Sequence, residues 1–122
     1  MKSYIVKRIK SFGWAFKGLF DLFRNHPNAQ IHLLAVLVVS GVGAFLGLSA
    51  TEWCLVLLCM VLVIGMEAMN TALEYLTDLV SPDYHPLAGK AKDVAAAGVL
   101  ICAIGAVGIA AIIFVPKLME LL

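Results

Sequence analysis

The sequence predicts an all-α integral membrane protein, with an N-terminal amphipathic surface helix and three transmembrane helices. Hydrophobic residues make up 62% of its 122 residues, and the mean hydropathy is +0.98. Soluble domains contain roughly 45–50% apolar residues, and so short a soluble chain could not bury this excess in its own core. Three long apolar runs point to lipid as the solvent, and the length allows a single membrane domain over residues 1–122.

Residues 4–24 are predicted to form the surface helix. Apolar side chains recur there at steps of three or four, at Ile5, Ile9, Phe12, Phe16, Leu19 and Phe23. Cations fall away from this apolar stripe, and an aromatic-rich stripe backed by cations is typical of a helix lying in the membrane interface. The stripe could also pack on the protein's own transmembrane helices, and both contacts can hold. Pro27 is expected to end the helix, because proline cannot extend a helix backwards without a clash.

The next two apolar runs are predicted to be transmembrane helices joined by a tight turn. Residues 31–48 carry no Asp, Glu, Lys or Arg and are long enough to cross a hydrocarbon core of roughly 30 Å. Ser49 or Thr51 can cap the second helix, predicted over residues 52–80, and Trp53 marks a membrane interface. The basic region before the first run is too long for the start of a signal peptide, so we expect this run to be retained.

The third transmembrane helix is predicted over residues 88–115, after a polar loop and before Pro116. Small residues recur along it at steps of three or four: Ala91, Ala95, Gly98, Cys102, Ala106 and Ala110. Such residues let helix backbones approach closely, which is how helices associate in lipid. Because three helices enclose little space, we expect the chain to associate with copies of itself.

The distribution of basic residues predicts the orientation in the membrane. Six of the nine Lys and Arg residues precede the first apolar run, and two more lie in the 81–92 segment. A cytoplasmic N-terminus places these eight on the inner side, as the positive-inside rule requires. We therefore expect a multi-pass protein of the cytoplasmic membrane. A nucleic-acid partner is not expected, because it would need many more cations and exposed aromatic residues on one face.

The second predicted span carries four polar residues: Glu67, Asn70, Glu74 and Asp78. Around the helix, Glu74 and Asp78 each lie roughly 20° from Glu67, and Asn70 about 60° from it. Counting about twenty residues from Trp53 puts Glu67 about 9 Å inside the hydrocarbon and Glu74 near its inner edge. Holding a carboxylate there costs about 2.5–3.5 kcal/mol on insertion scales. A cation, a metal ion or a proton must offset that cost.

A functional role explains these acids better than a structural one. Pairing Glu74 with Lys92 would account for one carboxylate and leave Glu67 and Asn70 unexplained. Paired carboxylates near a membrane face suit Mg²⁺, which needs one or two of them plus phosphate oxygens. A deeper carboxylate could take a proton from a lipid hydroxyl, and together these groups suit phosphoryl transfer. Because the glycines lack the spacing of a GxxxxGK[ST] loop, composition alone leaves an ion- or proton-conducting subunit as a close alternative.

Two strings add a family resemblance to this physical case. EAMNTALE at residues 67–74 and HPLAGKAKD at residues 85–93 resemble the prokaryotic diacylglycerol kinase family, which includes the undecaprenol kinases. The family pattern is close to E-x-x-N-[ST]-A-x-E followed by H-x-x-[AS]-x-x-A-K-D, and the likeness spans nearly the whole chain. Residues 28–32 and 48–53 resemble the undecaprenol kinase branch more than the enterobacterial diacylglycerol branch.

The resemblance implies a homotrimeric lipid kinase that uses MgATP, with active sites shared between neighbouring subunits. Carried over by position, Glu67 would be the catalytic base and Asn70 its positioning partner. Glu74 would hold the metal ion, while Lys92 and Asp93 would serve the phosphates and the geometry of the site. We expect the acceptor to be undecaprenol or diacylglycerol, with a slight preference for undecaprenol. A non-enzymatic ion- or proton-conducting trimer is the alternative.

The resemblance also carries over to the first helix, with one departure. Arg8 and Lys17 match basic positions that could reach the nucleotide. His26 stands where the family usually has an acid that helps Glu74 hold the metal ion. A histidine can ligate a divalent ion but favours transition metals, so either His26 is a metal ligand with altered preference or it is a solvated loop residue. An inactive family member is therefore a further alternative, and His32 is a weaker candidate for function.

Overall fold

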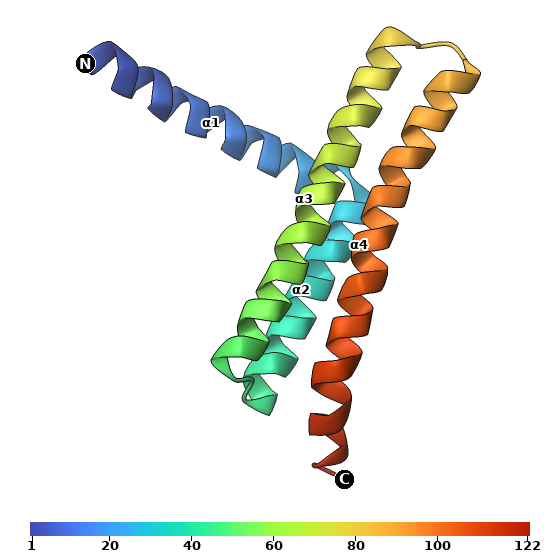
Figure 1. The fold of residues 1–122 in the computed structure, drawn as a ribbon. Coiled ribbons are helices and arrows are strands. Elements are labelled where there is room, and N and C mark those ends of the chain that lie inside the picture. The colour runs from blue at the N-terminus through green and yellow to red at the C-terminus, as the bar shows by residue number, and fades with distance from the viewer.

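The computed structural model describes residues 1–122, the side chain of residue 2 excepted, as four helices (Figure 1). They are α1 (Lys2–Asn25), α2 (Pro27–Leu46), α3 (Ala50–Val80) and α4 (Pro86–Met119). The last three run side by side with alternating direction, and the α3–α4 hairpin extends beyond the start of α2 (Figure 1). Each of the three is long and apolar enough to cross a membrane, which agrees with the prediction of three membrane-spanning helices.

The corner between α1 and α2 is built around a proline. Pro27 opens α2 at its first position, where a backbone N–H would have no helical partner in any case. His26 before it is extended, with φ −117° and ψ 108°. The Gln30 side chain donates to the carbonyls of Phe23 and Arg24, at 3.1 Å each. The last turn of α1 is thereby tied to the first turn of α2.

The turn between α2 and α3 is fixed by a glycine and a capping box. Gly47 ends α2 in the left-handed conformation, φ 67° and ψ 57°, which glycine adopts without a steric penalty. The Ser49 hydroxyl accepts a hydrogen bond from the Glu52 N–H at 3.2 Å, and the Glu52 carboxylate accepts one from the Ser49 N–H at 2.7 Å. This reciprocal pair satisfies two N–H groups at the helix start. Of the two predicted caps, Ser49 is therefore the one used.

Helices α3 and α4 make the most extensive contact in the chain. Gly98 leaves room for the Met66 side chain of α3, since a Cβ at this position would lie 2.6 Å from the Met66 methyl group. The buried hydrophobic cluster gathers at the end of the bundle that contains the α2–α3 turn, and comprises Leu48, Val56, Ile113 and Phe114.

The prediction that the third span ends before Pro116 is wrong, because α4 continues through this proline to Met119. One proline near a helix end removes a single backbone hydrogen bond. A contact between helices accompanies the extra turn, since the Lys117 ammonium lies 3.2 Å from the Glu52 carboxylate. The sequence pattern could not show this pairing between the end of α4 and the start of α3.

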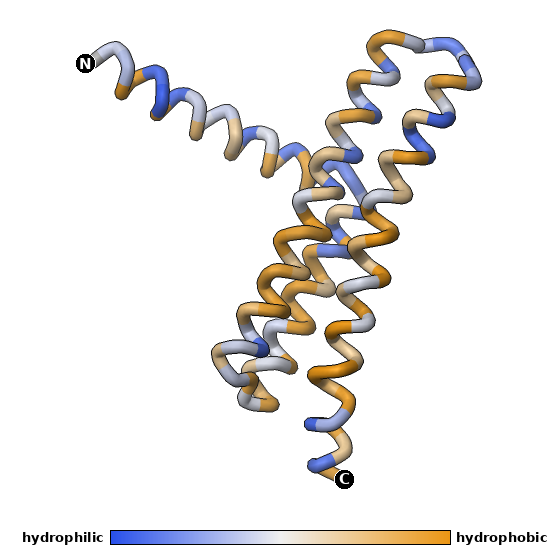
Figure 2. Tube along the Cα trace, in the orientation of Figure 1, coloured by the Kyte–Doolittle hydropathy of each residue, from blue (hydrophilic) through white to orange (hydrophobic). Residues whose placement is uncertain are grey.

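Helix α1 leaves the bundle at an angle and mixes hydrophilic and hydrophobic residues along its length, whereas the bundle is hydrophobic over most of its length (Figures 1 and 2). Ile5, Ile9, Phe12 and Phe16 of its apolar stripe are all exposed. Within one chain the stripe therefore does not pack on the transmembrane helices. Its placement in the membrane interface stays a prediction.

Candidate active site

Three polar side chains are buried midway along α3. Glu67 is 3% exposed, and Asn70 and Thr71 are 5% exposed each. Glu67 and Asn70 are the residues that the sequence placed inside the hydrocarbon. Thr71 occupies the [ST] position of the family pattern, but the sequence did not predict that it is buried. Buried polar groups of this kind normally have partners, so their surroundings show whether the structure satisfies them.

The carboxylate of Glu67 faces a histidine of α2. The His32 Nε2 lies 4.0 Å from Glu67 Oε2, and the two side chains are 22% and 4% exposed. His32 is only a weaker candidate from the sequence, which does not show which face of α2 meets α3. The structure brings these two titratable groups together from different helices.

Asn70 links the buried residues to Glu74 one turn further along α3. Its amide nitrogen donates to the Glu74 carboxylate at 3.3 Å, and Glu74 is half-buried. Among the described residues, the Asn70 Oδ1 and Thr71 Oγ1 atoms are buried without a hydrogen-bond partner. Unpaired buried oxygens are costly, so this part of the molecule is equipped to bind something polar.

Lys92 contacts Asp78 across the α3–α4 hairpin. The alternative in which Lys92 neutralises Glu74 is therefore not the arrangement seen. The loop between the helices sets which turn of α3 faces the start of α4, and the sequence does not specify that register. Asp93 is exposed on the next position of α4.

His26 joins a polar network where α1 and α2 meet α3. Its Nε2 lies 2.7 Å from the Tyr75 hydroxyl, which donates to Asp21 Oδ2 at 2.7 Å, and the Asn25 amide donates to Asp21 Oδ1 at 2.6 Å. These hydrogen bonds, first that from Tyr75 and then that from Asn25, hold the pKa of Asp21 below its ordinary value. Sequence reasoning did not consider Tyr75, although it directly follows Glu74. The network places His26 beside the residue that neighbours the predicted metal ligand.

The two predicted basic residues of α1 are not gathered around Glu67 in the single chain. Arg8 lies over the ring of Tyr4, with 5.0 Å between the guanidinium carbon and the ring centre. Lys17 lines a shallow surface groove along α1 together with Phe20 and Arg24. Helix α1 runs away from α3 (Figure 1).

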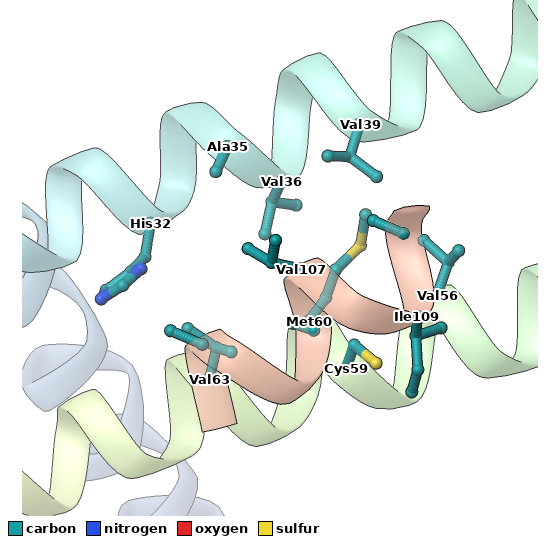
Figure 3. Close-up of a pocket in the computed structure, with 13 residues that line it drawn as sticks. His32, Ala35, Val36, Val39, Val56, Cys59, Met60, Val63, Val107 and Ile109 are labelled. Atoms are coloured by element: carbon teal, nitrogen blue, oxygen red, sulfur yellow. The ribbon is translucent and has the colours of Figure 1, made fainter. Parts of the chain in front are cut away.

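An apolar groove of about 200 Å³ lies between α2, α3 and α4. Figure 3 shows His32 at one end, with Val39 and Val56 towards the other. The remaining lining is almost wholly hydrocarbon and sulfur. The site thus combines a buried carboxylate, an imidazole and an adjoining hydrocarbon surface.

Comparison with known proteins agrees with this combination. The sequence model of the family described as prokaryotic diacylglycerol kinase matches residues 13–114. The chain is 38% identical to the undecaprenol kinase of Bacillus subtilis over 109 residues, 89% of each chain. It is 34% identical to the diacylglycerol kinase of Escherichia coli K12 over 99 residues, 81% of each chain. A diacylglycerol kinase of Synechocystis is 37% identical over 92% of this chain and 65% of its own length.

Proposed function

The chain belongs to the prokaryotic diacylglycerol kinase family and is a lipid kinase, and from this premise we propose that it transfers the γ-phosphate of ATP to the hydroxyl of undecaprenol. Diacylglycerol is the alternative acceptor. The observation that carries the proposal is the buried Glu67 carboxylate in a membrane-spanning helix, one turn from Asn70 and two from the half-buried Glu74. The 38% identity to an undecaprenol kinase supports the choice of acceptor.

Glu67 is proposed as the general base. Its carboxylate takes the proton of the acceptor hydroxyl, whose oxygen forms a bond to the γ-phosphorus while the bond from that phosphorus to the ADP oxygen breaks. Catalysis by a positioned base contributes about 10²–10⁴-fold. Asn70 holds the neighbouring Glu74 through its amide and keeps the stripe of polar groups aligned. Lys92 and Asp93 are proposed to serve the phosphates at the hairpin end of the bundle.

The residues around Glu74 fit a hard divalent cation. The carboxylate of Glu74 and the unpaired Oδ1 of Asn70 are oxygen donors of the kind that Mg²⁺ prefers, and Mg²⁺ takes its other ligands from phosphates and water. No cluster of three His, Cys, Asp or Glu side chains suited to a metal ion occurs in the described part of the chain. Glu74, with His26 nearby, would hold it, and the ion would neutralise phosphate charge.

We further propose that the kinase is a homotrimer of the cytoplasmic membrane with its N-terminus in the cytoplasm. In such an assembly α1 of one subunit could carry Arg8 and Lys17 to the nucleotide at a neighbouring site. The support is the outward course of α1 (Figure 1) and the exposure of its apolar stripe. Eight of the nine Lys and Arg residues would then lie on the side of the nucleotide.

A substrate panel tests this proposal. Purified protein in mixed micelles receives γ-labelled ATP, either undecaprenol or diacylglycerol, and Mg²⁺, Mn²⁺ or Zn²⁺. We expect label to enter undecaprenol with Mg²⁺. Transfer to diacylglycerol alone would correct the acceptor, and a preference for Zn²⁺ or Mn²⁺ would point to His26 as a ligand. Failure to label any lipid alcohol with any of the three ions would support the inactive alternative.

A further inference from the structure

We propose that His32 acts together with Glu67 on the acceptor. Its Nε2–H donates a hydrogen bond to the acceptor's hydroxyl oxygen, while the Glu67 carboxylate accepts the hydroxyl proton. This inference rests on the proposed function, because it needs Glu67 as the base. The observation behind it is the placement of an imidazole of α2 opposite a buried carboxylate of α3, with 4.0 Å between Nε2 and Oε2.

This separation suits one intervening oxygen atom. At 4.0 Å the two atoms are too far apart for a direct hydrogen bond. An oxygen about 2.9 Å from the nitrogen and about 2.7 Å from the carboxylate, both ordinary hydrogen-bond lengths, completes a triangle with the observed side. A single hydroxyl group therefore fits between His32 and Glu67 without movement of either helix.

The surroundings leave this gap as the natural place for a polar ligand. Within the described part of the chain, the charged group within 4.0 Å of the His32 ring nitrogens is the Glu67 carboxylate. On its other side His32 faces the groove, whose nearest walls are Ala35, Val36 and Val63 (Figure 3). A half-buried imidazole and a buried carboxylate without other polar contacts are expected to share a hydrogen-bonding partner.

The groove also explains why the partner would be a lipid alcohol. It follows α2 from His32 to Val39, which at 1.5 Å per residue is about 10 Å along the helix. Its hydrocarbon lining adjoins the gap directly, so a hydroxyl held there would have apolar surface beside the carbon chain that bears it. Water competes weakly for hydrogen bonds in such a setting, and the orientation of the hydroxyl then depends on the two side chains.

The test compares four proteins in steady-state assays, with the acceptor and MgATP varied separately. His32→Leu removes the donor, His32→Gln keeps an N–H at similar reach, and Val38→Ala alters an exposed position of α2 outside the groove. We expect His32→Leu to lower kcat/KM for the acceptor about 10- to 100-fold, the range for losing one hydrogen bond to a charged group, because the acceptor oxygen gains negative charge as Glu67 takes its proton. KM for MgATP should stay within twofold, His32→Gln should recover most of the loss, and Val38→Ala should match the unsubstituted protein.

The outcomes separate this inference from the proposed function. If the unsubstituted protein transfers phosphate, Glu67→Gln abolishes transfer and His32→Leu is fully active, then only the role of His32 is overturned. If the unsubstituted protein transfers no phosphate, the proposed function itself fails. A loss in His32→Leu that raises KM for MgATP equally, or that His32→Gln does not repair, would show a merely structural role. Should His32→Leu fail to fold, His32→Asn replaces it. Because the asparagine amide is too short to reach the acceptor, this variant must be clearly less active than His32→Gln.

Discussion

The two ends of the transmembrane part of α3 treat polar groups in opposite ways. At the end that holds the α2–α3 turn, which we call the capped end, Ser49, Glu52 and Lys117 satisfy one another through a capping box and an ion pair. Further along the same helix, at the polar site, Asn70 and Thr71 keep buried oxygens without a partner in the described chain. The capped end is complete as a folded structure, whereas the polar site is complete only once something binds to it.

This difference indicates which part of the helix serves stability and which serves chemistry. Polar groups buried in an apolar medium cost free energy unless they are paired. A sequence shaped for stability alone would place hydrophobic residues at positions 67, 70 and 71, as it does at most other positions of α3. Unpaired polar atoms at a buried site are therefore retained for binding or catalysis.

The largest effect is expected for Glu67→Gln at the polar site. The amide has nearly the same shape but cannot accept the acceptor's proton, so phosphoryl transfer should fall about 10²–10⁴-fold while thermal unfolding in detergent changes little. Transfer of label from ATP to lipid measures the first quantity. Glu52→Gln makes the same chemical change at the capped end and should keep full transfer activity. Equal losses in both variants would remove the distinction between the two regions.

Several features of the fold and of the polar site could be predicted from the sequence. The three spans follow from their length and hydropathy, the corner at Pro27 from proline chemistry, and the placement of Glu67 on one face with Glu74 from helical periodicity. Such features depend on residues close together in the chain, or on the solvent. They do not require knowledge of which helix faces meet.

The pairings between helices could not be predicted in the same way. His32 opposite Glu67, Lys92 with Asp78, and Tyr75 with His26 all depend on the rotation and register of helices that are apolar on most sides. An apolar circumference carries no signal for which face packs inward, because lipid and protein accept the same side chains. For the same reason, the continuation of α4 through Pro116 became visible only with its partner helix in place.

At the capped end, Ser49→Ala should reduce stability without reducing activity. The substitution removes the hydroxyl that accepts the Glu52 N–H, and loss of such a cap costs about 1 kcal/mol. Thermal unfolding in detergent would show the lower transition temperature, and lipid phosphorylation well below that temperature should be unchanged. A fall in kcat for Ser49→Ala would mean that the capped end and the polar site are coupled.

Thr71→Val should raise the stability of the protein, whereas Ser49→Ala lowers it. Valine keeps the shape of threonine but has no hydroxyl to leave buried and unpaired, so the substitution should stabilise the protein by about 1 kcal/mol. The same unfolding measurement checks it, and Thr77→Val is the matched control because the Thr77 hydroxyl already donates to the Leu73 carbonyl. Destabilisation by Thr71→Val would reveal a partner for this hydroxyl in the assembled protein.

The smallest effect is expected for Tyr75→Phe, at the corner where α1 meets α3. The polar groups of this corner are hydrogen-bonded, like those of the capped end, but they are exposed to water. The Tyr75 hydroxyl is the main cause of the lowered pKa of Asp21, so Tyr75→Phe should return that pKa towards its ordinary value of 3.8. A lowered carboxyl pKa stabilises the folded corner above about pH 4, and this contribution is lost as the pH falls through the folded pKa. Tyr75→Phe should therefore make the stability of this corner less sensitive to a fall in pH.

NMR titration of the Asp21 side-chain carbon measures this pKa, with Tyr84→Phe as the control because Tyr84 is an exposed loop residue. The change should be small, since solvent screens an exposed carboxylate. An unaltered pKa in Tyr75→Phe would mean that Asn25 alone perturbs Asp21. The hydrogen bond from Tyr75 would then contribute little to holding Asp21, and Pro27 and Gln30 would be the main features that fix the corner.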